Sequence, residues 1–259
     1  MLVFDGLSDI GLEKTVQEDI IFQDRFDEET YLFIIADGSG MVNENMNPAT
    51  IACMEVFQFL KRQYDHDKDY LIDNADFLME ESLYVANRVL GTFHIVNDET
   101  YSGFGSCMTA CLIYKKFLTF AHCGNTRLHL IKAAKDNDHG PTIHQLTVDH
   151  TKGYELLAKG KITEEQYLQG LEKLQLTSGL GIFSNVDIQV SSTRLPDNSI
   201  LVMTTDGVHY PLWQQAVLEL TLKAENTLSA AKALIDAAKI QKYPDNMSAL
   251  VIFSIPDSK

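Results

Sequence analysis

The sequence predicts an α+β fold, because β-rich runs and helical patterns come in separate groups along the chain rather than in regular alternation. Their order is strands, two helices, strands, an inserted segment, strands, helix and strand. The sequence has no internal repeat, low-complexity stretch or Pro/Gly-rich linker, and its 259 residues suit one large domain. We therefore expect a single domain over residues 1–259, with a flap-like insertion at residues 151–182.

The expected strands are short runs rich in β-branched and aromatic residues, each followed by polar or glycine-containing sequence. The first strand core is Ile20-Ile21-Phe22. The runs on either side of Lys115-Lys116 form a predicted hairpin. The longer runs cover residues 31–36, 109–114, 118–122, 127–131, 199–205 and 249–255.

Three longer segments carry apolar residues at helical spacing, and they are residues 48–64, 71–90 and 213–238. The last of these holds one or two helices. Within residues 151–182, a short helix is expected at 154–159, and Thr163-Glu-Glu-Gln166 has the capping-box pattern that begins another. Such an insertion either borders an active site or is a surface hairpin with no role, and pattern alone leaves both open.

Composition and charge exclude several classes of partner. The formal net charge of −15 argues against nucleic acid and anionic membranes, because both bind positive surfaces. No apolar run approaches the roughly 20 residues that span a bilayer. Residues 1–9 lack the features of a signal peptide, so we expect a cytoplasmic protein. The four cysteines form no C-x-x-C pair and are expected to be buried free thiols; they are Cys53, Cys107, Cys111 and Cys123.

Acidic residues recur where an apolar strand ends or begins, beside small or turn-forming residues. Any one such dipeptide is usually only a turn, but strand ends are where a scaffold can present several side chains to one cleft. Carboxylates can converge there only if a positive charge offsets their repulsion, and hard cations such as Mg²⁺ or Mn²⁺ prefer oxygen ligands. The sites are Glu18-Asp19, Asp37-Gly38, Asp206-Gly207 and Asp245-Asn246.

Nine segments, taken in order, resemble the motifs of the type-2C metal-dependent serine/threonine phosphatases, and of the bacterial branch in particular. Among them, Asp37-Gly38-Ser39-Gly40 is similar to a D-G-x-G-G turn, and Thr204-Thr-Asp-Gly207 is similar to an S-D-G motif. The resemblance covers nearly the whole chain. The segments are residues 11–19, 36–41, 105–110, 121–127, 146–151, 155–163, 177–181, 204–207 and 245–248.

The resemblance implies an αββα sandwich, in which two antiparallel sheets pack face to face and each is covered by a pair of helices. It also implies a site for two Mn²⁺ or Mg²⁺ ions, where Asp37 bridges both. The Gly38 carbonyl with Glu18 or Asp19 would hold one ion, and Asp206 with Asp245 would hold the other. A metal-activated water would hydrolyse phosphoserine or phosphothreonine of a protein substrate, with Asp37, Asp206 and Lys14 as the catalytic residues.

Four positions depart from the family pattern. Lys14 stands where the family has an arginine that binds the substrate phosphate. A lysine cannot bind phosphate in a bidentate way, so we expect weaker substrate binding. Ser39 stands where some members have a histidine. Asn125 and Tyr210 replace two aspartates of a third metal site, which we expect to be weak or empty. Of the histidines, His209 is expected to lie nearest the site.

Three readings of function follow. The first is an active protein serine/threonine phosphatase, supported by Asp37, Asp206 and Asp245. The second is a degenerate phosphatase fold that serves as a binding or regulatory module, suggested by the four departures. The third is a regulatory phosphatase that acts on one dedicated partner. The substrate protein, the choice between Mn²⁺ and Mg²⁺, the oligomeric state and the role of residues 151–182 stay open.

Overall fold

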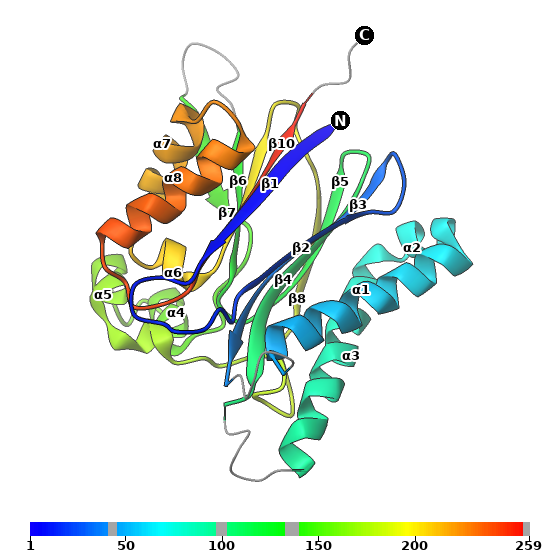
Figure 1. The fold of residues 1–259 in the computed structure, drawn as a ribbon, viewed down its shortest axis with the longest axis horizontal. Coiled ribbons are helices and arrows are strands. Elements are labelled where there is room, and N and C mark those ends of the chain that lie inside the picture. Colours follow the sequence, from blue (N-terminus) through cyan, green and yellow to red (C-terminus); the bar gives the residue numbers. More distant parts are fainter. Residues whose placement is uncertain (41–45, 97–102, 133–139, 256–259) are drawn as a thin grey trace.

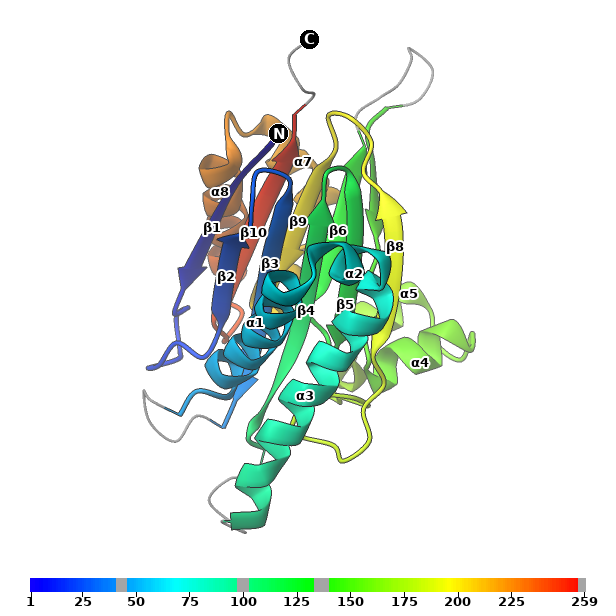
Figure 2. The same cartoon turned by 90° about the vertical axis from the view of Figure 1, so that its right-hand side faces the viewer.

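Two five-stranded antiparallel sheets face each other, with helices on their outer faces (Figures 1 and 2). The computed structural model describes residues 1–40, 46–96, 103–132 and 140–255. Residue 41, at the end of one family motif, lies outside these ranges. The α+β class and the αββα layering predicted above are confirmed.

The first sheet has the strand order β1-β10-β9-β6-β7 and the second sheet has the order β2-β3-β4-β5-β8. Strands of the first sheet are β1 (Leu2–Asp9), β10 (Met247–Ser254), β9 (Ile200–Thr204), β6 (Arg127–Lys132) and β7 (Thr142–Gln145). Strands of the second sheet are β2 (Ile20–Arg25), β3 (Thr30–Ser39), β4 (Gly105–Tyr114), β5 (Phe117–Cys123) and β8 (Gln189–Arg194).

The helices divide between the two outer faces and the end of the sandwich (Figure 1). The second sheet is covered by α1 (Pro48–His66), α2 (Lys68–Asp73) and α3 (Ala75–Val96). The first sheet is covered by α7 (Gln214–Lys223) and α8 (Thr227–Ile240). The short helices are α4 (Lys152–Ala158), α5 (Glu164–Gln169), the 3₁₀ helix η1 (Leu171–Leu174) and α6 (Asp206–His209).

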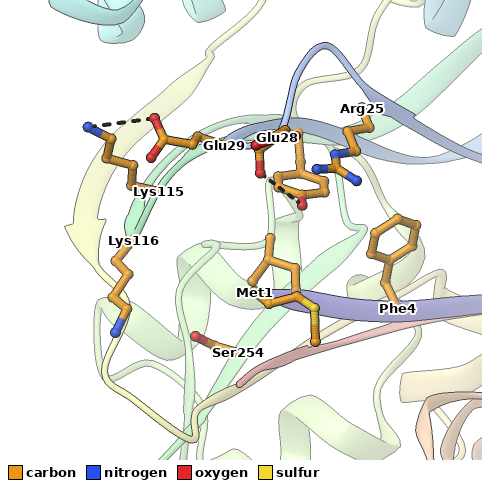
Figure 3. A pocket seen from close by; sticks show the side chains of 10 residues that line it. Met1, Phe4, Arg25, Glu28, Glu29, Lys115, Lys116 and Ser254 are labelled. Atoms are coloured by element: carbon orange, nitrogen blue, oxygen red, sulfur yellow. Dashed lines mark hydrogen bonds and ion pairs between the residues drawn. The ribbon is translucent and has the colours of Figure 1, made fainter. Parts of the chain in front are cut away.

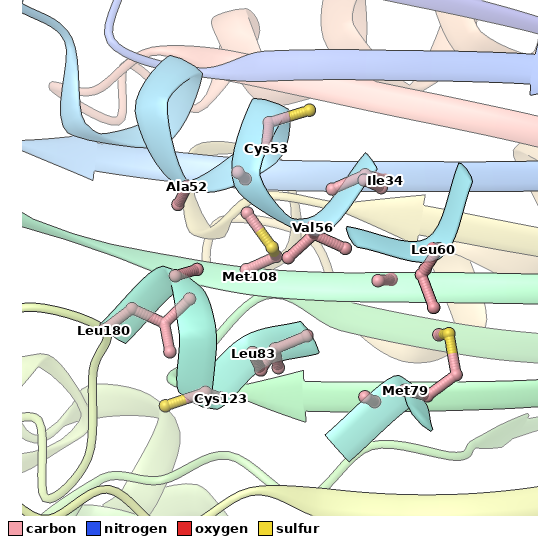
Figure 4. Close-up of a cluster of buried hydrophobic side chains, with 14 of the residues drawn as sticks. Ile34, Ala52, Cys53, Val56, Leu60, Met79, Leu83, Met108, Cys123 and Leu180 are labelled. Atoms are coloured by element: carbon pink, nitrogen blue, oxygen red, sulfur yellow. The ribbon is translucent and has the colours of Figure 1, made fainter. Parts of the chain in front are cut away.

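Strand β3 shows why this sequence makes four layers. Successive side chains of a strand point to opposite faces, so a strand buried on both sides must be apolar throughout. Leu32 and Ile34 pack against the helices over the second sheet, while Phe33 and Ile35 pack between the sheets. Strand β10 divides in the same way, with Val251 against α7 and α8. Figure 4 shows the layer between the second sheet and its helices, where Ile34 meets Val56 and Leu60 of α1.

Several elements differ from the sequence prediction. The helix expected over residues 71–90 is two helices, because the chain turns at Asn74, whose backbone N–H donates to the Tyr70 carbonyl and ends α2. Residues 213–238 hold two helices, which is within the one or two expected, and α8 begins with a capping box at Asn226. Strands β1, β7 and β8 and helix α6 were not predicted. None of the helices in the described ranges is long and apolar enough to span a membrane.

Candidate active site

The acidic residues singled out from the sequence gather at one end of the sandwich. Asp37 follows Phe33 and Ile35 on the inter-sheet face of β3, so strand alternation directs it between the sheets. Asp206 is the first residue of α6, directly after β9, and Asp245 lies in the loop before β10. These three aspartates line one cavity of about 330 Å³. Its other walls include Ser39, Ser106, Asn125, Leu174, Leu176, Ile182 and Tyr243.

Asp19 lies beneath this cavity and is almost completely buried. Its Oδ2 accepts a hydrogen bond of 2.8 Å from Thr205 Oγ1, next to Asp206. The neighbouring Glu18 instead faces Lys14, with 3.7 Å between Oε2 and Nζ. The sequence left open which of the two acids joins the carboxylate group. In this structure Asp19 is the one whose charge acts on both Asp37 and Asp206.

At this end of the sandwich, burial and mutual repulsion disfavour the ionised form of the carboxylates. Burial, followed by the charges of Asp206, Asp19 and Asp245, raises the pKa of Asp37 well above its usual value. Burial, then Asp245 and Asp19, raises the pKa of Asp206 to about 7. Burial also raises the pKa of Asp19 to about 7, although the Thr205 hydroxyl partly opposes this. The site therefore has negative charge that the protein itself does not neutralise.

Lys14 is the cation placed at the edge of this acidic group. Its ammonium lies 2.9 Å from Asp245 Oδ1. Burial works against the charged ammonium, but the hydrogen bond and charge of Asp245 outweigh it and the pKa of Lys14 is raised. Lys14 is thus held charged beside the cavity, where it can meet an incoming anion.

The loop that carries Lys14 and the acidic pair is fixed by residues that the sequence reading passed over. Asn246 Oδ1 accepts the Glu18 backbone N–H at 2.8 Å, and its Nδ2 donates to the carbonyls of Ile10 and Val16. Gly11 has φ +81°, and a Cβ there would lie 2.1 Å from the Asp245 carbonyl oxygen. Asn after Asp245 reads as a turn in sequence, and only the fold shows that it joins two distant segments.

Gly38 and Asn47 support the same loop from the other side. A Cβ on Gly38 would lie 2.8 Å from the Glu18 carbonyl oxygen and 2.9 Å from Asn47 Oδ1, so a larger residue does not fit. Asn47 caps α1 by accepting the Ala49 N–H at 2.8 Å, and its Nδ2 donates to the Glu18 carbonyl at 3.1 Å. The start of α1 therefore positions the acidic segment.

Asn125 and Tyr210, two of the departures from the family pattern, contact each other. Asn125 Nδ2 donates to Asp206 Oδ2 at 3.1 Å and to the Tyr210 hydroxyl at 3.2 Å. An ionised Asp206 only accepts hydrogen bonds, which sets this orientation of the amide. Asn125 Oδ1 is buried and has no hydrogen-bond partner among the described residues. An unsatisfied acceptor beside Asp206 is one more oxygen donor available to a cation.

These residues fit a divalent cation in their chemistry. The donors are carboxylate, amide and backbone oxygens, which suit Mg²⁺ and Mn²⁺, and their uncompensated charge is what a cation offsets. In the described ranges, no three Asp, Glu, His or Cys side chains converge closely enough to form a complete metal-binding group. Two of the carboxylates have other partners in this arrangement: Lys14 contacts Asp245, and Asn125 donates to Asp206.

Other residues near the motifs have structural contacts. His209, which among the three histidines was expected to lie nearest the site, does not line the cavity; it is buried, and its Nδ1 is 3.0 Å from Thr204 Oγ1. Arg127 forms a buried ion pair with Asp149, with 2.6 Å between NH2 and Oδ2. All four cysteines are buried and free, as predicted.

A cavity of about 390 Å³ lies at the opposite ends of the strands, between the start of β1 and the β2–β3 turn (Figure 3). Its charged side chains have both signs, and Lys115 pairs with Glu29 at 3.6 Å. Phe4 contributes an apolar wall. Because the cations of this cavity lie beside acidic residues and lack the buried carboxylates of the other cavity, the carboxylate cavity is the better candidate for catalysis.

The chain is similar in sequence and fold to known bacterial phosphatases. No family model matches the chain. A putative protein phosphatase 2C-type of Streptococcus pyogenes is 23% identical over 248 residues, which are 95% of this chain and 94% of that protein. The solved Streptococcus agalactiae serine/threonine phosphatase is 24% identical, with a TM-score of 0.82 over 99% of this chain and all of that one.

The catalytic domain of the serine/threonine phosphatase PstP, solved in complex with two manganese ions, is 20% identical. Its TM-score is 0.75, over 98% of this chain and 99% of that one. The relatives of nearly full length and the solved structures with this two-sheet fold are bacterial protein phosphatases. The chain is similar, over nearly its whole length, to bacterial serine/threonine phosphatases of the type-2C, or PPM, family, and it has their fold. Phosphatases of this family use divalent metal ions.

Proposed function

We propose that this chain is an active phosphatase that hydrolyses phosphoserine and phosphothreonine in proteins, with Mn²⁺ or Mg²⁺ held by its buried carboxylates. The observation that carries the proposal is the acidic end of the sandwich, where Asp37 and Asp206 line one cavity. Burial and the charges of the nearby aspartates raise the pKa values of both. Burying several carboxylates together destabilises the folded protein unless a bound cation offsets their repulsion.

The proposed ligands are those inferred from the family resemblance. The charges of Asp206, Asp19 and Asp245 all act on Asp37, which suits the bridging position, with the Gly38 carbonyl beside it. Asp206 and Asp245 line the same cavity, and Asp19 supports them from below. Glu18 is closer to Lys14 than to the cavity and is the weaker candidate. We expect two ions, and no strong third site, because Asn125 and Tyr210 carry no negative charge at neutral pH.

The chain's own residues define the substrate position. Bound divalent ions supply a water acidic enough to ionise near neutral pH and neutralise phosphoryl oxygens. Lys14 stands at the edge of the cavity and would exchange its contact with Asp245 for a phosphate oxygen. Ser39 lines the same cavity and offers a hydroxyl there. Leu174, Leu176 and Ile182 make an apolar wall that limits access of bulk water.

Hydrolysis of a phosphothreonine peptide, with and without Mn²⁺, tests this function. The wild type should need the metal, and Asp206→Asn should lose about 100-fold or more in kcat/KM, since it removes a charged ligand. A matched control is Asp236→Asn on the exposed face of α8; this aspartate forms an ion pair with Lys232, and its substitution should leave the rate unchanged. Metal-independent turnover, or equal rates in both variants and wild type, would refute the proposal.

A binding or regulatory module is the second candidate. The contact between Lys14 and Asp245 favours it, because this ion pair lowers the demand for a cation at Asp245. If the wild type binds Mn²⁺ but hydrolyses neither the peptide nor p-nitrophenyl phosphate, this candidate replaces the first. The partner would still be a phosphorylated protein, and we retain a cytoplasmic location as a prediction. A regulatory phosphatase with one dedicated partner would instead hydrolyse that partner and not generic peptides.

A further inference from the structure

The flap, residues 151–182, forms one wall of the proposed active site. Leu174 and Leu176 line the same cavity as Asp37 and Asp206. Leu174 ends η1, and its side chain is exposed to solvent at the cavity mouth. The position of η1 therefore sets the shape of the surface that a peptide substrate meets on its way to the carboxylates.

Tyr210 connects η1 directly to the floor of this cavity. Its hydroxyl donates a hydrogen bond of 2.7 Å to the Lys173 carbonyl, one residue before Leu174. The same hydroxyl accepts from Asn125 Nδ2, which also donates to Asp206. The Lys173 ammonium lies 5.2 Å from the centroid of the Tyr210 ring. A continuous set of hydrogen bonds thus runs from Asp206 through Asn125 and Tyr210 to the flap.

A second set of hydrogen bonds attaches the flap to the body of the protein, at α5 rather than at η1. Tyr167 of α5 donates to Asp149 Oδ2 at 2.7 Å and accepts from Arg127. That buried contact fastens α5 to the body of the protein.

Around η1, the flap is held by the Tyr210 hydroxyl and also by the chain at the start of α4. There the Lys152 N–H donates to the Gln175 carbonyl and the Thr177 N–H donates to the His150 carbonyl, both at 2.8 Å. A Cβ on Gly153 would come within 2.8 Å of the Lys173 nitrogen.

We propose that Tyr210 is a positioning residue that fixes the Leu174–Leu176 wall against the active site and thereby sets how tightly a phosphopeptide binds. Tyr210 occupies a position where the family resemblance implies a metal-binding aspartate, and here the space goes to a contact between flap and body. The effect on substrate rests on the proposed function. The contact itself does not.

Hydrogen exchange of the metal-free protein tests the contact without any activity. Tyr210→Phe keeps the ring over which Lys173 lies and removes only the hydroxyl. Amides of residues 171–176 should exchange about tenfold faster, which is the loss expected for one buried hydrogen bond. The control is Tyr154→Phe in α4, a flap tyrosine whose hydroxyl forms no hydrogen bond with any residue that the structure describes and whose ring packs edge-on against Tyr167. Unchanged exchange in Tyr210→Phe, or an equal increase in the control, would overturn the proposal.

A double-mutant cycle then tests how Tyr210 acts on substrate. Tyr210→Phe and Leu174→Ala should each raise KM for a phosphothreonine peptide about three- to tenfold, with a smaller effect on kcat. If Tyr210 acts through the wall, the double variant should be no worse than the poorer single variant. Additive effects would contradict action through Leu174. An inactive wild type would refute the proposed function, while the exchange result would still decide whether Tyr210 holds the flap.

Discussion

At the scale of single residues, the aspartates that make the site useful also destabilise the metal-free protein. Burial and neighbouring charge raise the pKa of Asp206 to about 7, against an ordinary value of 3.8. As pH rises through about 4, the unfolded chain loses this proton first, so the folded state loses stability until the pH passes about 7. Stability and function therefore oppose each other at this residue.

Asp206→Asn should accordingly stabilise the metal-free protein. The gain should be about 1–3 kcal/mol at pH 8, where wild-type Asp206 must ionise, and should largely vanish at about pH 3, where the carboxyl is mostly protonated in the unfolded chain as well as in the folded one. Urea unfolding of both proteins in the presence of a chelator at these two pH values measures the difference. A variant that is less stable than wild type at pH 8 would show that the aspartate is not under electrostatic strain.

Lys14 gives a second prediction at this scale. Arginine has a planar fork that binds phosphate through two hydrogen bonds, whereas lysine offers a point charge. Lys14→Arg should lower KM for a phosphopeptide about threefold or more, and Lys14→Met, which keeps the length and removes the charge, should raise it about tenfold. Steady-state kinetics at saturating Mn²⁺ measures both. Equal KM values in the three proteins would mean that Lys14 does not meet the phosphate.

At the scale of elements, the start of α1 has two roles that can be separated. Asn47 caps the helix and also holds the Glu18 carbonyl. Asn226 caps α8, far along the chain from any acidic motif. Both Asn→Ala changes should cost about 1 kcal/mol of stability, as N-cap losses do. Only Asn47→Ala should also lower kcat/KM, because only it loosens the acidic loop. Thermal unfolding and peptide hydrolysis of the pair provide the comparison, and matched activity losses would contradict this account.

Elements with strong patterns were predictable from sequence, and the weaker ones were not. Strand β3 is apolar on both faces, and the capping box at Thr163 begins α5 as predicted. Strand β8 reads Gln-Val-Ser-Ser-Thr-Arg, with too little apolar character to be recognised, because it lies at the edge of its sheet. Edge strands need fewer buried residues, so composition alone does not reveal them.

The candidate site divides in a similar way. The aspartates stand at strand ends and carry a local signal, so their gathering was predictable as a hypothesis. Asn246, Asn47 and Thr205 act through contacts with segments far away in sequence, which no local pattern encodes. The role of Tyr210 was likewise hidden, since sequence shows only that an acid is replaced and not that the flap lies within reach.

At the scale of the whole molecule, buried neutral histidines make stability depend on pH. Burial, with the charge of His150 in one case and of Arg127 in the other, lowers the pKa values of His122 and His129 to about 3. In the unfolded chain these groups take up protons near pH 6.5. Since folded values are depressed, their effect is absent above pH 7 and stability is lost as the pH falls below about 6.5.

Each such histidine should remove about 1.4 kcal/mol per pH unit below 6 until its folded pKa is approached. His129→Leu should therefore make the stability curve between pH 6 and pH 4.5 less steep than that of wild type, because one proton-uptake site in the unfolded chain is gone. Urea unfolding across this range measures the slope. An unchanged slope would mean that His129 titrates normally in the folded protein.

The central claim is that the acidic end of the sandwich binds divalent cations. Calorimetric titration of Mn²⁺ into the metal-free protein, with wild type and Asp37→Asn side by side, tests it most directly. We predict saturable binding of two ions by the wild type, and loss of at least one site, with weakening of the other, when the bridging carboxylate is neutralised. If Mn²⁺ binds neither protein, or binds both with the same affinity and stoichiometry, then the carboxylate cavity is not a metal site and the proposed phosphatase mechanism is wrong.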